Sequence, residues 1–414
     1  GKAVVIQNIK DGIVIRHFEL NRTYNAAWCS TATILTPKIS VNESERTLIR
    51  GDKWNRYYYT VYKNDTVRWC ESYIYSYMWT SAAKVYPNNL RYVDFGNSVV
   101  QEAIKRNDKI NALIESVEKV IVGKRKSIEL VIAAMLTGGH ILIEDVPGVG
   151  KTRLVSAIAR SCGGAFGRIQ LTPDVMPSDI TGFTMINTVT HESEFRKGAA
   201  FCNFLLADEI NRASPKSQSA LLEIMEEGQV SIDGNTYPLP KPFMVLATQN
   251  PVETYGTYHL PEAQMDRFLM RISMGYPSPK EELEILDRNE NSISSSELTP
   301  VISCDDICAL CDKVKLIRCS ENIKQYIIDI VNATRNADYI SLGVSPRGSI
   351  ALYKTAKAYA MISGRAYVIP DDIKFLAPYI LAHRIILTPK GKAACGSSEG
   401  AVAKILETVN VPVE

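Results

Sequence analysis

A glycine-rich segment at residues 145–152 carries the residue types that bind phosphate groups. Glycines let consecutive backbone N–H groups turn inward, where they can donate to phosphate oxygens. Lys151 would reach the β- and γ-phosphates of ATP, and the Thr152 hydroxyl would coordinate Mg²⁺. Asp145 stands where this pattern usually has glycine. The predicted nucleotide-binding residues here are Pro147, Gly148, Val149, Gly150, Lys151, Thr152 and Arg153.

Two acids, Asp208 and Glu209, follow the apolar run of residues 204–207. Charged side chains at the end of a buried strand are costly, so an acid pair there suggests a chemical role. We expect Asp208 to bind the nucleotide and Mg²⁺, and Glu209 to take a proton from the attacking water or to orient it. A further apolar run, residues 243–247, is followed three residues later by Asn250, whose amide would orient water beside the γ-phosphate.

The elements around these residues support the same interpretation. Residues 140–144 are typical of a buried strand, and the apolar spacing after Thr152 is typical of a helix. A strand, a glycine-rich loop and a helix form the context that a phosphate-binding loop requires. Strands and helices then alternate to about residue 276, which predicts a parallel α/β sheet. The carboxyl ends of such strands converge on one crevice, so the three sites are expected to meet.

The chain of 414 residues divides into three regions of different texture. Residues 1–97 are predicted to form a small all-β domain, a barrel or sandwich, followed by a linker from about residue 87. Residues 98–277 are predicted to form the α/β ATPase domain, and residues 278–414 a compact helical lid domain.

Composition narrows the class of protein. The net charge is +2, which gives no global argument for nucleic acid or an anionic membrane. No apolar run approaches the ~18 residues of a membrane helix. The nine cysteines lie among apolar neighbours, which is typical of free thiols in a reducing compartment. We therefore expect a cytoplasmic protein.

Residues from about 107 to 414 closely resemble the MoxR family of AAA+ ATPases. The resemblance rests on long, specific stretches on both sides of the phosphate loop. Residues 139–144 precede the loop, and residues 172–182, 207–213, 217–223, 247–251 and 260–268 follow it.

The resemblance implies further roles. Asn250 matches the sensor 1 position, Arg267 the arginine finger, and Arg347 the sensor 2 arginine of the lid. Arg271 lies one turn beyond Arg267 and is the alternative finger. An arginine finger spreads positive charge over the transferring phosphate oxygens. Val122 and Gly123 match the segment that lies against the adenine.

The resemblance also implies how the protein works. Relatives assemble as ring-shaped homo-oligomers, here expected to be a hexamer, and hydrolyse ATP in chaperone-like remodelling, maturation or assembly of a client protein. Clients or partners with von Willebrand factor A domains are expected. Two alternatives stay open: a motor subunit of the metal-chelatase type, and a nucleotide-gated module that only presents the amino-terminal domain.

Two hairpin-like segments are candidate client contacts. Residues 230–237 alternate around Asp233-Gly234, which predicts a hairpin after a helix that begins at Ser214-Pro215 and ends at Gly228. Residues 183–198 match the family's insertion. At its end, Gly198-Ala199-Ala200-Phe201 departs from the family pattern. Both segments have an ordinary alternative as surface hairpins.

Three cysteines, Cys304, Cys308 and Cys311, have a spacing that also occurs in iron–sulfur enzymes. A cluster would require a loop, because three ligands must wrap around it. Ser303 and Asp306 instead match a helix capping box. We therefore predict a helix with the three thiols on one partly buried face.

The amino-terminal region contains all four tryptophans and, in its first 97 residues, 13 Lys and Arg against 8 Asp and Glu. It faintly resembles bacterial Src-homology-three-like domains, which implies binding of a protein or peptide. A basic, aromatic-rich module could also bind nucleic acid by stacking. The sequence does not choose between these partners.

Overall fold

The protein is described here from a computed structural model. It describes residues 97–412 except 147, 187–190, 251–256, 259 and 291–296, and strand segments in the region before residue 97. Side chains are described from residue 108 onward, apart from those gaps and residues 288–290. By internal contacts the chain divides into two units, residues 1–105 with 365–367, and the remaining residues from 106 to 414.

The first unit is β-rich, as predicted. Its strands pair in the order β4-β5-β6-β3-β2-β1-β8, with β7 also beside β3 and with antiparallel pairing throughout. Part of the segment expected to be a linker forms β8. The strands are β1 Lys2–Ile9, β2 Gly12–Asn21, β3 Ala26–Ile34, β4 Arg46–Gly51, β5 Arg56–Val61, β6 Thr66–Arg68, β7 Ile74–Tyr75 and β8 Leu90–Tyr92.

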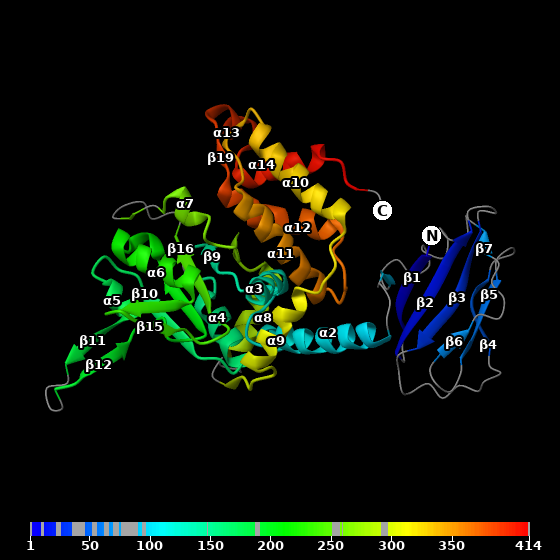
Figure 1. Cartoon of the computed structure of the whole chain (residues 1–414), viewed down its shortest axis with the longest axis horizontal. Helices are drawn as coiled ribbons and strands as arrows, with labels where there is room; N and C mark the ends of the chain where they lie inside the picture. Colours follow the sequence, from blue (N-terminus) through cyan, green and yellow to red (C-terminus); the bar gives the residue numbers. More distant parts are fainter. Residues whose placement is uncertain are drawn as a thin grey trace. The chain divides into compact units, whose positions relative to one another are not determined.

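A parallel five-stranded sheet in the order β10-β13-β16-β9-β17 is the centre of the second unit (Figure 1). This order confirms the predicted α/β class. Short apolar runs give short strands, which are buried because helices cover both faces of the sheet. The strands are β9 Ile141–Glu144, β10 Phe166–Gln170, β13 Phe204–Asp208, β16 Met244–Gln249 and β17 Met270–Ile272.

The two faces of the sheet pack against different helices. Successive side chains of a strand point to opposite faces, so Ile141 and Ile143 join the core that contains α2, α3 and α4, whereas Leu142 joins the core beneath α6. All three side chains are fully buried. The helices are α2 Asn97–Glu118, α3 Arg125–Thr137, α4 Lys151–Ser161 and α6 Pro215–Glu227, with the short helix α5 Pro177–Thr181 beside α6.

The carboxyl-terminal region is helical, as predicted, and its core is continuous with that of the sheet. In α10 the apolar stripe of Ile323, Ile327, Ile330 and Val331 is buried. A small antiparallel pair, β18 Ile340–Leu342 and β19 Ile386–Leu387, joins two of its loops. The helices are α8 Pro279–Glu290, α9 Cys304–Val314, α10 Glu321–Asn336, α11 Pro346–Ile362, α12 Pro370–Leu381, α13 Pro389–Cys395 and α14 Ser398–Thr408.

Both expected hairpins form. β14 Gln229–Ile232 pairs with β15 Asn235–Pro238, and Asp233 and Gly234 between them both have positive φ, as a two-residue hairpin turn requires. β11 Gly182–Ile186 pairs with β12 Ser193–Lys197. The rings of Phe195 and Tyr237 stack at 4.1 Å, so the two hairpins contact each other.

The cysteine segment is a helix, which confirms that prediction. Ser303 Oγ accepts from the Asp306 N–H at 3.1 Å, so the capping box begins α9. Cys304 and Cys311 each lie within 3.6 Å of a backbone carbonyl oxygen, of Cys162 and Met135 respectively. In the described part of the chain, no helix has the length and apolar character needed to span a membrane.

Candidate nucleotide-binding site and the opposite edge of the sheet

The predicted phosphate loop connects β9 to α4. Gly148 and Gly150 have φ of +87° and +92°, a region that residues with a Cβ rarely adopt. Apart from the adjacent residues, no atom of the described residues lies within 4 Å of where a Cβ would stand at either position, so space is open above the loop. α4 begins at Lys151, so its amino-terminal N–H groups are available to an anion. This geometry fits the phosphates of ATP, whereas Pro147 lies outside the described residues.

Lys151 is held close to the loop. Its Nζ donates to the backbone carbonyl of Asp145 at 2.6 Å. Burial lowers its pKa, and the nearby carboxylates of Asp145, Asp208 and Glu209 oppose that shift. A partly desolvated ammonium that donates to a backbone carbonyl can exchange this partner for a phosphate oxygen. Thr152 is partly buried beside it, and Arg153 is exposed.

Asp145, the departure from the usual glycine, has a structural role of its own. Its buried carboxylate accepts hydrogen bonds from Ser273 Oγ at 2.7 Å, Met274 N at 2.5 Å and Gly275 N at 3.2 Å. These residues follow β17 and lead into the lid. Asp145 therefore connects the phosphate loop to the segment between the sheet and α8.

The two predicted acids end β13, beside β16. The Thr248 hydroxyl donates to Asp208 Oδ1 at 3.2 Å and accepts from the Glu209 N–H at 2.9 Å. Glu209 has φ +57° and ψ +53°, which is uncommon for a residue other than glycine. Its carboxylate accepts from Arg212 Nη1 at 3.2 Å. Strained backbone of this kind is frequent at functional sites.

The register of the sheet brings the remaining predicted groups to the same edge. Gln249 pairs with Glu144, and the Asp145 N–H donates to the Gln249 carbonyl at 3.3 Å. Buried Asn250 therefore follows its strand directly beside the phosphate loop. Of the segment predicted to contact adenine, Val122 is buried, and Gly123 lies so close to α8 that a Cβ would meet the Glu281 side chain.

Arg168 is a residue at this edge that the sequence did not single out. Its Nε donates to Asp208 Oδ2 at 2.8 Å, from the neighbouring strand β10. Asp208 is thus bonded at both oxygens.

Thr152, at the start of α4, and Asp208 are the residues predicted to bind a metal ion. Hard oxygen donors of this kind fit Mg²⁺, which usually keeps several of its own waters. Thr152 and Asp208 would hold the ion, which would neutralise charge on the phosphates.

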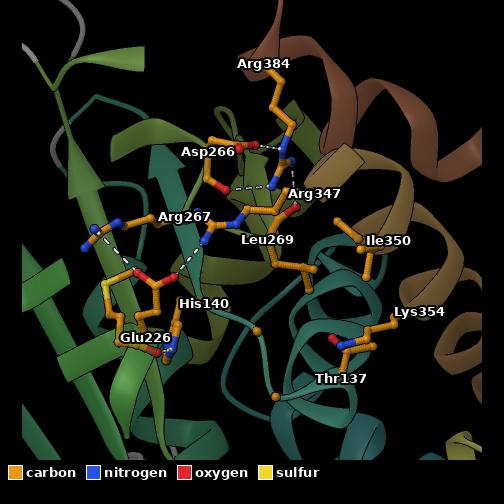
Figure 2. A pocket seen from close by; sticks show the side chains of 14 residues that line it. Thr137, His140, Glu226, Asp266, Arg267, Leu269, Arg347, Ile350, Lys354 and Arg384 are labelled. Atoms are coloured by element: carbon orange, nitrogen blue, oxygen red, sulfur yellow. Dashed lines mark hydrogen bonds and ion pairs between the residues drawn. The ribbon is translucent and has the colours of Figure 1, made fainter. Parts of the chain in front are cut away.

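A cavity of about 320 Å³ lies at the opposite edge of the sheet (Figure 2). His140 and Leu269 line it, and they directly precede β9 and β17, whereas the phosphate loop follows β9. A strand of this length separates the two places by roughly 15 Å. The lining includes no residue of the described part of the phosphate loop.

The two predicted arginines meet in this cavity. Arg267 Nη2 lies 3.4 Å from one oxygen of Glu226, and Arg347 Nη2 lies 2.7 Å from the other (Figure 2). The arginine of the lid therefore lies beside the predicted finger, at the edge away from the phosphate loop of the same chain. Glu226 is the residue before the last of α6, and the sequence gave no signal for its role.

His140 positions this edge from within. Its Nδ1 accepts from the Val245 N–H at 2.9 Å, so its Nε2–H donates to the Met225 carbonyl at 2.8 Å. Burial lowers its pKa to about 4, so the ring is neutral. The ring therefore ties β16 to the end of α6, next to Glu226.

Arg271, the alternative finger, has partners within its own chain. Its Nη1 lies 3.0 Å from Glu144 Oε2, and its Nη2 donates to Glu399 of α14. These contacts join the sheet to the lid. The Arg271 side chain is also less exposed than that of Arg267, 21% against 34%.

Two family models match the chain where these groups lie. Residues 140–270 match the model of the ATPase family associated with various cellular activities, and residues 332–405 match an AAA lid domain. The first range contains the phosphate loop, both acids and Arg267. The second contains Arg347 and most of the described lid.

Full-length relatives agree. The chain is 53% identical over 301 residues to the uncharacterized protein YeaC of Bacillus subtilis, covering 73% of this chain and 94% of YeaC. It is 42% identical over 308 residues to the chaperone MoxR1 of Mycobacterium tuberculosis, covering 72% and 81% of the two chains. The crystal structure of a candidate ATPase from Cytophaga hutchinsonii is 42% identical and superposes with a TM-score of 0.71, covering 76% of this chain and 98% of that one. The chain belongs to the MoxR family of AAA+ ATPases.

Proposed function

We propose that this ATPase hydrolyses MgATP between neighbouring subunits of a homo-oligomeric ring, with six subunits as the expected number. The observation that supports this is the position of Arg267 and Arg347, which share Glu226 at the edge of the sheet opposite the phosphate loop. Neither arginine is placed to reach ATP on its own loop. Head-to-tail packing would bring them to the ATP of the next subunit, because such interfaces join two different surfaces.

The residues at the nucleotide edge would divide the work of hydrolysis. Gly148, Gly150 and Lys151 would hold the phosphates, and Asn250 would orient the attacking water. Glu209 would accept its proton, since its strained backbone directs it from the end of β13. Arg267 and Arg347 of the neighbour would stabilise charge on the transferring oxygens. Turnover would then depend on assembly.

We further propose that hydrolysis drives chaperone-like remodelling of a client protein in the cytoplasm. The relative from Mycobacterium tuberculosis is named a chaperone, and the seven cysteines in the described residues are free thiols, as a reducing compartment favours. The stacked hairpins at Phe195 and Tyr237 are the proposed client contact. A client or partner with a von Willebrand factor A domain, and a protein or peptide ligand for residues 1–97, are part of the proposal.

A mixing experiment tests the shared site. Arg267→Ala should bind ATP with unchanged affinity and lose about 10³–10⁵ in turnover, the range known for arginine fingers. Lys151→Ala should neither bind nor hydrolyse ATP. Mixing the two should restore activity, because some interfaces then pair an intact loop with an intact arginine. Turnover per subunit should also rise with protein concentration.

The comparison with Arg347→Ala sharpens the test. This variant should lose about ten- to a hundredfold in turnover, because it lacks the second cation that faces the charge on the transferring oxygens. Mixing with Lys151→Ala should rescue it as well. If the mixtures stay inactive while mass spectrometry shows that subunits exchange, or if dilute monomer is fully active, the shared site is wrong.

A further inference from the structure

The segment that carries the finger is fixed by a buried arginine of the lid. Arg384, in the short helix η3 Ala382–Arg384, has a side chain only 2% exposed. Its guanidinium donates to three backbone carbonyls of this segment, at Asp266 (3.1 Å), Phe268 (2.6 Å) and Leu269 (3.1 Å). It also donates to Ile380 O, within the lid. A planar group with five donors can hold a loop in one geometry, as a lysine cannot.

The Asp266 carboxylate joins this arginine to the helix that carries Arg347. Oδ1 accepts from Arg384 Nε at 2.6 Å, and Oδ2 accepts from Ser345 Oγ at 3.0 Å. Ser345 is the residue before α11, yet its hydroxyl makes no capping bond to that helix. It is directed to Asp266 instead, two residues before Arg347.

The first turn of α11 also packs directly on the same arginine. A Cβ at Gly348 would lie 2.4 Å from Val344 Cγ1 and 3.0 Å from Arg384 Cδ, so the glycine leaves room for both side chains. Arg267 follows Asp266, and Arg347 precedes Gly348. Each arginine is therefore one residue away from a residue packed against Arg384, and Figure 2 shows the bonds between Asp266 and Arg384.

We propose that Asp266 and Arg384 are positioning residues that fix Arg267 and Arg347 as one rigid unit, presented together to the ATP of the next subunit. This inference rests on the proposed function, because it requires both arginines to act across an interface. The distance between Arg267 and Arg347 is then set within a single chain before the subunits assemble. A misplacement on the order of 1 Å can cost about 10²-fold in rate, so such preassembly has a large effect.

The main test is Asp266→Asn, which keeps the shape of the side chain and removes the charge that faces Arg384. We expect the affinity for a fluorescent ATP analogue to stay within about twofold, since the phosphate loop is at the other edge. Turnover should fall about ten- to a hundredfold through kcat. Mixing with Lys151→Ala should restore activity, because that partner supplies an intact arginine unit. A misfolded subunit would give no such rescue.

A milder variant keeps the test decisive if Asp266→Asn does not fold. Ser345→Ala removes one bond to the Asp266 carboxylate without removing a helix cap. It should lower kcat about two- to fivefold, because the bonds between Asp266 and Arg384 remain. The loss should vanish in an Arg347→Ala background. Ser320→Ala is the matched control, because its hydroxyl does cap α10, at 3.3 Å from Ile323 N, and it lies outside this unit.

The outcomes separate this inference from the proposed function. If Arg267→Ala is rescued by mixing but Asp266→Asn and Ser345→Ala keep the parent kcat, the rigid unit is wrong and the shared site stands. If Ser345→Ala loses the same factor with and without Arg347, the coupling is also wrong. If Arg267→Ala itself is not rescued, the proposed function fails first.

Discussion

The two edges of the central sheet are prepared in opposite ways. At the carboxyl edge, the phosphate loop has open space above two glycines, and Lys151 is held by one backbone carbonyl. At the amino edge, Arg267 and Arg347 already share the carboxylate of Glu226. One edge has open space beside a lysine, whereas the other holds its two cations against a carboxylate.

The difference also appears in how each edge is built. Residues adjacent in the chain form the phosphate loop, whereas Arg347 and Glu226 are 121 residues apart. Local structure is sufficient for the phosphate loop, but the pairing of the two arginines with Glu226 requires the lid to be folded onto the sheet. Any defect in the packing of the lid should therefore affect the arginines before it affects nucleotide binding.

Glu209→Gln should separate ATP binding from turnover more strongly than any other variant. The variant keeps the loop and Lys151, so ATP binding should persist, whereas turnover should fall by about 10²–10⁴, the scale of a general base. Binding is measured with a fluorescent analogue and turnover by phosphate release. Glu227→Gln, the same change at the exposed end of α6, is the control and should retain activity. Parent-rate hydrolysis by Glu209→Gln would remove Glu209 from the mechanism.

Acid should lower the free energy of unfolding through His140, which lies at the amino edge of the sheet. The native pKa is about 4, below the ordinary value of 6.5. Between these values only the unfolded state binds the proton, so stability falls as pH decreases, by about 2 kcal/mol from pH 7 to pH 5. His140→Gln should lack this part of the pH dependence.

Urea unfolding at both pH values measures the effect. The signal should be the circular dichroism of the helices rather than tryptophan fluorescence, because all four tryptophans lie within the first 79 residues. The exposed His191 provides the control: His191→Gln should keep the parent pH dependence. An identical slope for the parent and His140→Gln would show that the buried ring does not produce it.

The smallest effect is expected for Arg271→Gln. Its ion pairs with Glu144 and Glu399 lie within one chain, and pairs of this kind contribute at most about 1 kcal/mol when partly exposed. Turnover should change less than about threefold. A loss as large as that of Arg267→Ala, together with rescue by Lys151→Ala, would transfer the role of the finger to Arg271.

The sequence alone determined the parts of this protein that depend on neighbouring residues. The strand, glycine-rich loop and helix around Lys151 were predicted in order, and the capping box at Ser303 and the turn at Asp233 formed as expected. The β-rich character of the first unit was also predictable, although its barrel or sandwich architecture and its resemblance to Src-homology-three-like domains stay predictions. Such features follow from backbone geometry and hydrophobic period, which are properties of short segments.

Only the tertiary structure decided how distant groups pair. From the sequence, Asp145 was a departure from a pattern, and only the fold shows that its carboxylate binds the residues after β17. Arg267 and Arg347 were both singled out, but their common partner Glu226 and the contacts of Arg384 with Asp266 were not. The packing of the lid against the sheet brings Arg384 to Asp266, 118 residues earlier in the chain. No local propensity encodes such a contact, because it exists only when both surfaces are already folded.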